Sequence, residues 1–217
     1  LLPALCGGDE TSKTLRRHNA EGSSKHTVKG DWMIITDRYN EALSYAETLH
    51  RSQLRKGTSI PYISHLMTVS ALVLEHGGDE DQAIAGLLHD AAEDQGGEAT
   101  LADIKTRFGG SVAAIVADCT DSWEEPKPEW RQRKEAYIVS LFKKPHASLL
   151  VSLADKTHNA EAILHDYHEI GDDIWARFTG GKDGTHWYYQ SLRESFAELI
   201  PGRLQQRMAN AVDRFVQ

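Results

Sequence analysis

The chain has 217 residues, 40% of them hydrophobic and 26% charged, as in an ordinary folded protein. This composition excludes collagen-like, coiled-coil and wholly disordered chains, and no run of about 18 apolar residues offers a membrane-spanning helix. The net charge of −8 argues against binding a nucleic-acid polymer, which needs a basic surface, but a small phosphorylated ligand needs only a few local cations.

The cysteine and histidine counts bear on the kind of site the chain can hold and on its location. Cys6 and Cys119 are the only cysteines, which is too few for a disulfide framework or a cysteine-rich zinc site. A reducing cytoplasm is therefore the expected location. Eleven histidines are many for this length, so we ask whether some share a site with carboxylates.

Residues 1–32 differ from the rest of the chain. They mix Gly, Ser, Thr, Lys and Asn without a sustained apolar period, which is typical of disordered segments. Met33 opens the first well-patterned stretch. We expect a disordered arm or a non-native extension over 1–32, and one folded domain over 33–217.

From Asp37 onward the apolar residues recur at the helical period of 3.6. Asp37, Ser64 and Asp79 are predicted to cap the first three helices, and the pattern Thr100–Asp103 is predicted to start another. Gly77–Gly78 and Gly109–Gly110 separate helices, and a proline-containing loop covers 122–128. Further helices are predicted near 129–143, 146–165, 171–178, 183–200 and 203–216. No strand pattern occurs, so we expect an all-α, single-domain protein.

One predicted helix carries an acidic patch. Asp90 lies three residues before Glu93 and four before Asp94, so the three carboxylates share a face beside His89. No Lys or Arg occurs between Asp79 and Gly97, so a cation is the natural compensation for these charges. The alternative is an acidic, solvated helix end.

Two other stretches supply similar groups. His65 stands in the first turn of its helix, and an apolar helix delivers Asp155, with His158 one turn later. A single helical His is more often a core or surface residue than a ligand, and Asp155 alone can pair with Lys156. Taken together, two imidazoles and two carboxylates suit Mn²⁺, Fe²⁺ or Zn²⁺ better than Mg²⁺.

The order of these motifs resembles a known family. His65, His89-Asp90 and Asp155 occur as in the HD superfamily of metal-dependent phosphohydrolases. More narrowly, Arg55-Lys56 before Pro61-Tyr62, the stretch 89–94 and the stretch 153–159 are similar to the hydrolase domain of RelA/SpoT proteins and to small alarmone hydrolases. The resemblance covers about residues 37–200.

This resemblance implies an HD-type helical bundle with a bound Mn²⁺ ion held by four ligands: His65, His89, Asp90 and Asp155. It implies that Glu93 and Asp94 orient and deprotonate the attacking water or protonate the leaving oxygen. The implied substrates are guanosine tetra- and pentaphosphate, which would lose their 3′-pyrophosphate to give GDP or GTP.

The resemblance also implies contacts to this substrate, and each of these residues has a purely structural role as the alternative. Arg55 and Lys56 would contact the guanine and its phosphates, or else form a solvated helix end. The remaining candidates are His50, which contacts phosphate or only packs; Asn159, which bonds ribose or base or its own helix; Tyr188, which reaches the nucleotide or fills the core; and Arg133 and Lys134, which neutralise distal phosphates or face solvent.

Two departures from the family pattern bear on the base pocket. The loop from Gly57 to Ile60 is one residue longer and lacks an acidic residue, and Ala160-Glu161-Ala162 replaces a common Met-Arg-Thr. Two alternatives therefore stand beside alarmone hydrolysis. One is an HD phosphohydrolase for another nucleotide, such as a 5′-nucleotidase or an NADPH phosphatase, and the other is a non-catalytic nucleotide-binding module.

Overall fold

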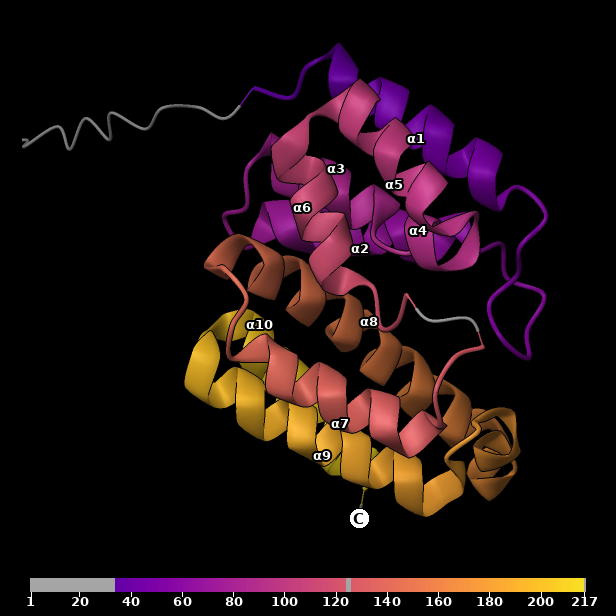
Figure 1. Cartoon of the computed structure of the whole chain (residues 1–217). Coiled ribbons are helices and arrows are strands. Elements are labelled where there is room, and N and C mark those ends of the chain that lie inside the picture. Colours follow the sequence, from indigo (N-terminus) through magenta and orange to yellow (C-terminus); the bar gives the residue numbers. More distant parts are fainter. Residues whose placement is uncertain (1–33, 124–125, 217) are drawn as a thin grey trace, which may run out of the picture. The chain divides into compact units, whose positions relative to one another are not determined.

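The computed structural model describes residues 34–123 and 126–216, and their regular structure is helical, which confirms the all-α prediction (Figure 1). The elements are α1 (Asp37–His50), α2 (Ile63–Glu75), α3 (Glu80–Leu88), α4 (Ala91–Asp94), α5 (Gly97–Phe108), α6 (Gly110–Cys119), α7 (Trp130–Leu141), α8 (His146–Ile170), the 3₁₀ helix η1 (Gly171–Arg177), α9 (Gly181–Leu199) and α10 (Arg203–Phe215). Within these described ranges the one β-type pairing is an isolated bridge between Leu54 and Pro61.

Two predictions concern the whole chain: the arm over 1–32 with its boundary at residue 33, and the absence of a membrane-spanning helix. The disordered arm or extension expected over 1–32 lies outside the described residues and stays a prediction, as does the domain boundary at residue 33. None of the described helices combines the length and hydropathy needed to cross a bilayer.

The helix starts follow the sequence signals only in part. Asp79 caps α3 through a capping box, as predicted. Thr36, rather than Asp37, caps α1. Ser64 and Thr100 are not caps but lie inside their helices, where their hydroxyls donate to the carbonyls of residues 61 and 95. Each hydroxyl bonds to a backbone carbonyl three to five residues earlier in the chain instead of capping a helix. Helices α2 and α5 therefore begin earlier than the pattern predicts.

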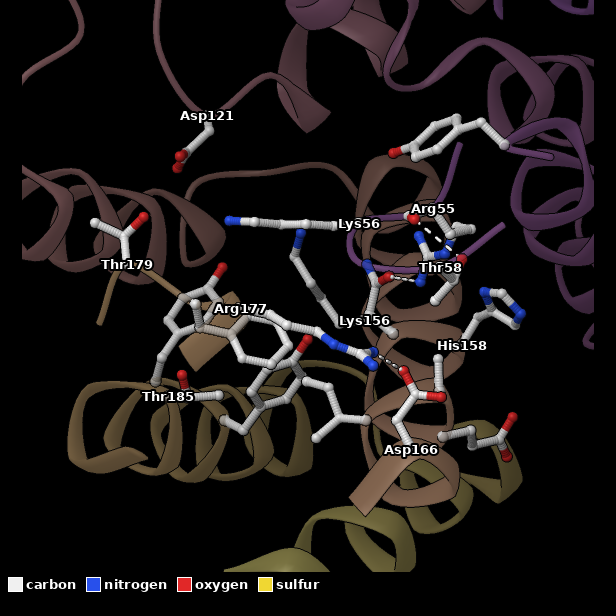
Figure 2. Close-up of a pocket in the computed structure, with 18 of the residues that line it drawn as sticks. Arg55, Lys56, Thr58, Asp121, Lys156, His158, Asp166, Arg177, Thr179 and Thr185 are labelled. Atoms are coloured by element: carbon white, nitrogen blue, oxygen red, sulfur yellow. Dashed lines mark hydrogen bonds and ion pairs between the residues drawn. The ribbon is translucent and has the colours of Figure 1, made fainter. Parts of the chain in front are cut away.

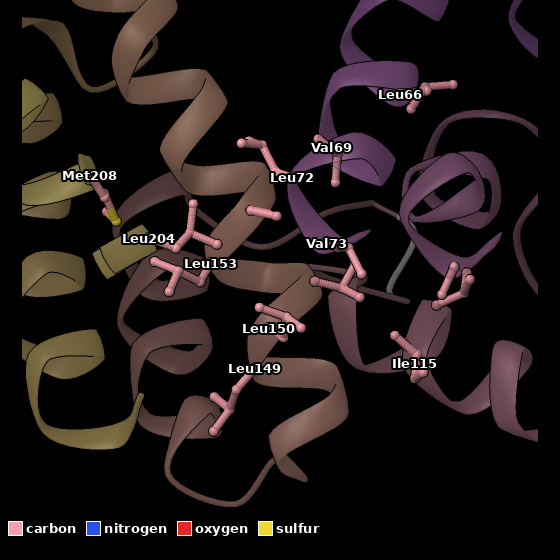
Figure 3. Packing of buried hydrophobic residues seen from close by; sticks show 14 of the residues in the cluster. Leu66, Val69, Leu72, Val73, Ile115, Leu149, Leu150, Leu153, Leu204 and Met208 are labelled. Carbon is pink, nitrogen blue, oxygen red and sulfur yellow. The ribbon is translucent and has the colours of Figure 1, made fainter. Parts of the chain in front are cut away.

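Helix α8 is the central element of this fold. It packs against α2, α3 and α6 on one side and against α10, η1 and α9 on the other (Figure 1). Its residues Leu149, Leu150 and Leu153 belong to one buried cluster with Leu72 and Val73 of α2 and with Leu204 and Met208 of α10 (Figure 3). Asp155 lies on the part of α8 that these helices cover, and it is 5% exposed.

The acidic patch does not lie on one continuous helix, which corrects the prediction. Helix α3 ends at Leu88, the backbone turns at His89 and Asp90, and the short helix α4 begins at Ala91. Asp90 is the N-cap residue of α4, and its carbonyl accepts a hydrogen bond of 2.9 Å from the amide of Asp94. The carboxylate of Asp90 faces His65 of α2, whereas that of Glu93 faces the loop after α6.

The loop between α1 and α2 folds back on itself. The amide of Arg55 donates to the carbonyl of Ile60, and the amide of Tyr62 donates to that of Gln53. Gly57 has a φ of +74° at the tip of this loop, where a Cβ atom would lie 2.6 Å from Cδ of Arg177. The glycine therefore permits both the turn and the close packing that hold Arg55 in place.

Candidate active site

Four predicted metal ligands from separate parts of the chain converge in the structure. Nε2 of His65 lies 3.3 Å from Oδ1 of Asp155 and 3.7 Å from Oδ2 of Asp90. Nε2 of His89 lies 3.0 Å from Oδ2 of Asp90 and 3.6 Å from Oδ1 of Asp155. Two imidazoles and two carboxylates thus face one point between α2, the α3–α4 turn and α8.

Each of these side chains is fixed by a second contact on its other side. His65 meets His158 at 2.7 Å between their Nδ1 atoms, and His89 Nδ1 lies 2.9 Å from the carbonyl of Gly86. The hydroxyl of Tyr62 donates to Asp90 at 2.5 Å. Asp155 accepts hydrogen bonds from Lys156 and Asn159. Such outer contacts orient ligands and select the tautomer of each imidazole.

The charges at the centre favour ionised carboxylates. Burial opposes ionisation of Asp90, but the imidazoles of His89 and His65 hold the pKa of this carboxyl well below its usual range. Burial likewise opposes ionisation of Asp155, whose pKa is nevertheless held well below its usual range by Lys156 and the same two imidazoles. Although burial opposes a charge on His89, the two carboxylates raise its pKa well above the ordinary value.

The donor set fits a divalent cation. Nε2 of His65 and of His89 are buried and have no hydrogen-bond partner among the described residues, and they point at the two carboxylates. His65, His89 and Asp155 offer ligand atoms within 4.8 Å of one another. A metal attracted by the same carboxylates would displace a proton from His89, since imidazole ligates in its neutral form.

The two acidic residues after Asp90 have different surroundings. Glu93 accepts hydrogen bonds from Lys127 at 2.9 Å and from the amide of Asp121 at 3.1 Å. Asp94 accepts one from Gln53 at 2.8 Å. Its side chain reaches solvent, yet the protein around it removes enough water to raise its pKa, and the charge of Asp90 adds to this shift. Glu93 is therefore held by one ammonium and one amide, whereas the pKa of Asp94 is raised by burial and by the charge of Asp90.

A cavity of about 730 Å³ adjoins this centre (Figure 2). Tyr62, Lys156, His158 and Asn159 line it and also hydrogen-bond to three of the four predicted ligands, so they form the wall between the cavity and the centre. The cavity has an unusual share of cations for an acidic chain: Arg55, Lys56, Lys127, Arg133, Lys134, Lys156 and Arg177. The carboxylates of Glu93, Asp121, Glu161 and Asp166 also line it, so cations outnumber them by seven to four and an anionic ligand is favoured.

Several of these cations are held in place by partners. Arg133 and Lys134 both bind Asp121, so neither lies on a solvated face. In Figure 2, Arg177 reaches toward Asp166, to which it is bonded at 2.6 Å. These pairs fix the positions of the guanidinium and ammonium groups around the cavity.

The predicted substrate contacts fall into two groups. Arg55, Lys56, Asn159 and Tyr188 all line the cavity. His50 does not: it is 2% exposed, stacks on Tyr62 and lies 2.7 Å from Gln53. The structure therefore gives His50 a packing position behind Tyr62, which is the simpler of its two predicted roles.

Asn159 connects two parts of the site. Its Oδ1 accepts a hydrogen bond of 2.7 Å from Arg55, and its Nδ2 donates to Asp155. Arg55 also lies over the ring of Tyr62, which donates to Asp90. Arg55 is thus linked through one residue each to both carboxylates of the centre.

Three contacts of the candidate site were missed by reasoning from the sequence. Tyr62 was part of a motif but had no role assigned, and the contacts of Gln53 to Asp94 and of Lys127 to Glu93 were not anticipated. The signal for Tyr62 was its position three residues before His65. No local pattern points to Gln53 or Lys127, because each meets its carboxylate across the fold.

Comparisons with known proteins agree with this geometry. Residues 42–186 match the family described as HD domain. The chain belongs to this family. Guanosine-3′,5′-bis(diphosphate) 3′-pyrophosphohydrolase MESH1 of Mus musculus is 32% identical over 182 residues, covering 75% of this chain and 93% of the relative. The enzyme of the same name from Xenopus tropicalis is 38% identical over 142 residues, covering 63% and 73%.

A solved structure has the same fold. It is described as a metazoan ortholog of SpoT that hydrolyses ppGpp, and it superposes with a TM-score of 0.70 at 25% identity. The match covers 86% of this chain and all of the solved one. The predicted membership of the HD family is therefore confirmed, including its likeness to SpoT-type hydrolases.

Proposed function

We propose that this HD domain protein is a divalent-metal-dependent guanosine-3′,5′-bis(diphosphate) 3′-pyrophosphohydrolase. The observation that carries the proposal is the convergence of His65, His89, Asp90 and Asp155 beside a cation-lined cavity. Relatives named for this activity, one of them matched over 93% of its length, support the choice of substrate.

The four convergent side chains would hold the metal, and we propose Mn²⁺ because a mixed set of two imidazoles and two carboxylates suits it. A bound divalent cation lowers the pKa of water to roughly 7–9 and withdraws electrons from a phosphoryl oxygen. Tyr62, His158, Lys156 and Asn159 keep the ligands aimed at one point.

The remaining proton transfers fall to the α4 carboxylates. Asp94 is the proposed base, because its raised pKa favours accepting a proton and its bond to Gln53 orients it. Glu93, held by Lys127 and the amide of Asp121, positions the loop after α6 against the cavity. In the overall reaction a water oxygen bonds to the phosphorus on the ribose 3′ oxygen, the bond to that oxygen breaks, and the 3′ oxygen gains a proton.

The cavity residues bind the nucleotide. Arg55 would stack on the guanine, since a planar guanidinium packs on an aromatic ring and already lies over Tyr62. Lys56, Lys127 and Lys156 would neutralise phosphate oxygens, and Tyr188 would pack against the nucleoside. The cytoplasmic location expected from the cysteine content stays a prediction.

The test is to incubate the purified protein with ppGpp and Mn²⁺, with and without chelator, and to resolve the products. We expect GDP and pyrophosphate, with no turnover when chelator is present. Deoxynucleoside monophosphates and NADPH serve as competing substrates. Release of orthophosphate from one of these, with ppGpp left intact, would replace this proposal by an HD phosphohydrolase for another nucleotide.

The variant Asp155→Asn tests whether the chain is an enzyme at all. It keeps the size of the side chain but removes a charge from the centre, so turnover should fall to background. Asp118→Asn, on α6, is the matched control, because its carboxylate accepts a hydrogen bond from Ser148 instead of facing the centre. Equal activity of both variants would favour a nucleotide-binding module whose turnover comes from a contaminant.

A further inference from the structure

His158 makes an unusual contact for a residue that is not in the ligand set. Its Nδ1 lies 2.7 Å from Nδ1 of His65, and the two rings stack with centroids 4.9 Å apart. Each imidazole therefore presents the same nitrogen to the other. A hydrogen bond at this distance needs one proton between the two nitrogens, so one ring donates and the other accepts.

The direction of this bond decides whether His65 can bind a metal. Nε2 of His65 faces Asp155 and Asp90, at 3.3 Å and 3.7 Å. It ligates a cation only through a lone pair, so the proton of a neutral His65 must be on Nδ1. His65 is then the donor and His158 the acceptor, and the reverse arrangement would place a proton on the ligating nitrogen.

The second nitrogen of His158 is constrained in turn. Since its Nδ1 accepts, the proton of a neutral His158 must be on Nε2. Nε2 of His158 has no hydrogen-bond partner among the described residues, and it is accessible instead of buried. His158 lines the cavity beside Arg55. An N–H group is thus available at the wall between the metal centre and the ligand.

We propose that His158 is a positioning residue that holds His65 in its metal-binding tautomer and donates its Nε2–H group to a phosphate or ribose oxygen of the substrate. The inference rests on the proposed metal site and extends it. It predicts that one side chain affects both metal affinity and substrate affinity, through different nitrogens.

Two substitutions separate these effects. The Oδ1 atom of Asn reaches about where Nδ1 of His lies, so His158→Asn keeps an acceptor for His65 and loses the donor toward the cavity. His158→Leu loses both. His168→Leu is the matched control, because His168 is an exposed histidine of the same helix and does not line this cavity.

Three readouts are needed. Long-range proton–nitrogen NMR spectra of the protein with labelled histidine report the tautomers, with diamagnetic Zn²⁺ as the metal. Calorimetry reports the Mn²⁺ affinity. Steady-state kinetics with ppGpp report kcat and KM, and circular dichroism checks that each variant is folded.

We expect a proton on Nδ1 of His65 and on Nε2 of His158. Mn²⁺ affinity should fall 10–100-fold in His158→Leu and stay near the wild-type value in His158→Asn and His168→Leu. At saturating Mn²⁺, His158→Asn should show a raised KM for ppGpp with kcat little changed.

A proton on Nδ1 of His158, or wild-type Mn²⁺ affinity in a folded His158→Leu, would overturn the tautomer assignment. An unchanged KM in His158→Asn would overturn the substrate contact. If the wild-type protein does not hydrolyse ppGpp at all, the proposed function fails, but the NMR and calorimetry still decide the role of His158 at the metal. If His158→Leu does not fold, the tautomers and the His158→Asn affinity decide it alone.

Discussion

The hydroxyl of Tyr62 offers a sharp test of how the metal centre is organised. It donates to Oδ2 of Asp90 at 2.5 Å, and burial raises the pKa of this phenol, so it remains a donor at every working pH. Tyr62→Phe removes the hydroxyl and keeps the ring, which stacks on His50 and lies under Arg55. The packing should therefore survive while Asp90 loses its orienting contact.

The expected size of the effect follows from the kind of hydrogen bond that is lost. A hydrogen bond to a charged group contributes about 1.5–3 kcal/mol. Since each 1.4 kcal/mol is a factor of ten in affinity, Mn²⁺ should bind roughly 10- to 100-fold more weakly. Calorimetry with Mn²⁺ measures this directly, and turnover of ppGpp should recover as the Mn²⁺ concentration is raised.

A second tyrosine provides the control for this experiment. The hydroxyl of Tyr39 lies 2.8 Å from Oγ of Ser70, in a neutral pair between α1 and α2. Tyr39→Phe should reduce stability slightly and leave Mn²⁺ affinity unchanged. If Tyr62→Phe binds Mn²⁺ as tightly as the wild type does, Asp90 does not need this contact and the reasoning about outer contacts is refuted.

Three further predictions concern proton transfer, metal removal and a buried ion pair. Burial and the charge of Asp90 raise the pKa of Asp94, so kcat should fall as the pH decreases through that pKa. Gln53→Leu removes a donor that stabilises the carboxylate and should move the midpoint of the pH–kcat profile to higher pH. An unmoved profile would exclude Asp94 as the base. Mn²⁺ at about 100 times its Kd should raise the free energy of unfolding by about 2.7 kcal/mol, and chelator should reverse this in urea titrations; overlapping curves would mean that the folded state binds no metal. Lys156→Met leaves the buried carboxylate of Asp155 without its ammonium partner and should cost about 3–5 kcal/mol of stability with chelator present, whereas a loss below about 1 kcal/mol would show that the pair is not structurally important.

The fold was largely accessible from the sequence because helical periodicity is a local signal. The apolar spacing located the long helices to within a few residues, and Asp79 marked the start of α3 correctly. The turn at His89 and Asp90 was missed, since neither these residues nor their neighbours include the Gly or Pro that marks a helix end in sequence. Helix α8 continues to Ile170, past the predicted end at 165, because Gly171, with a φ of +60°, is the residue that ends it.

The candidate site shows the same division between local and non-local information. The candidate metal ligands could be recognised because each lies in a short sequence motif. The structure brings them together: His65, His89, Asp90 and Asp155. The outer partners of His65 and Asp90 depend on tertiary packing, whereas those of His89 and Asp155 lie within four residues in the chain. His158 was noted as following Asp155, but nothing in the spacing shows that its ring meets the one at position 65.

Anomalous diffraction at the manganese edge, from crystals grown with Mn²⁺, tests the central claim most directly. The account predicts one strong peak per chain, bounded by Nε2 of His65, Nε2 of His89 and the carboxylates of Asp90 and Asp155. The chain offers a second, more exposed group of candidate ligands at His165, Asp166 and Glu169. A peak at this second group alone, with none between α2, the α3–α4 turn and α8, would contradict the account.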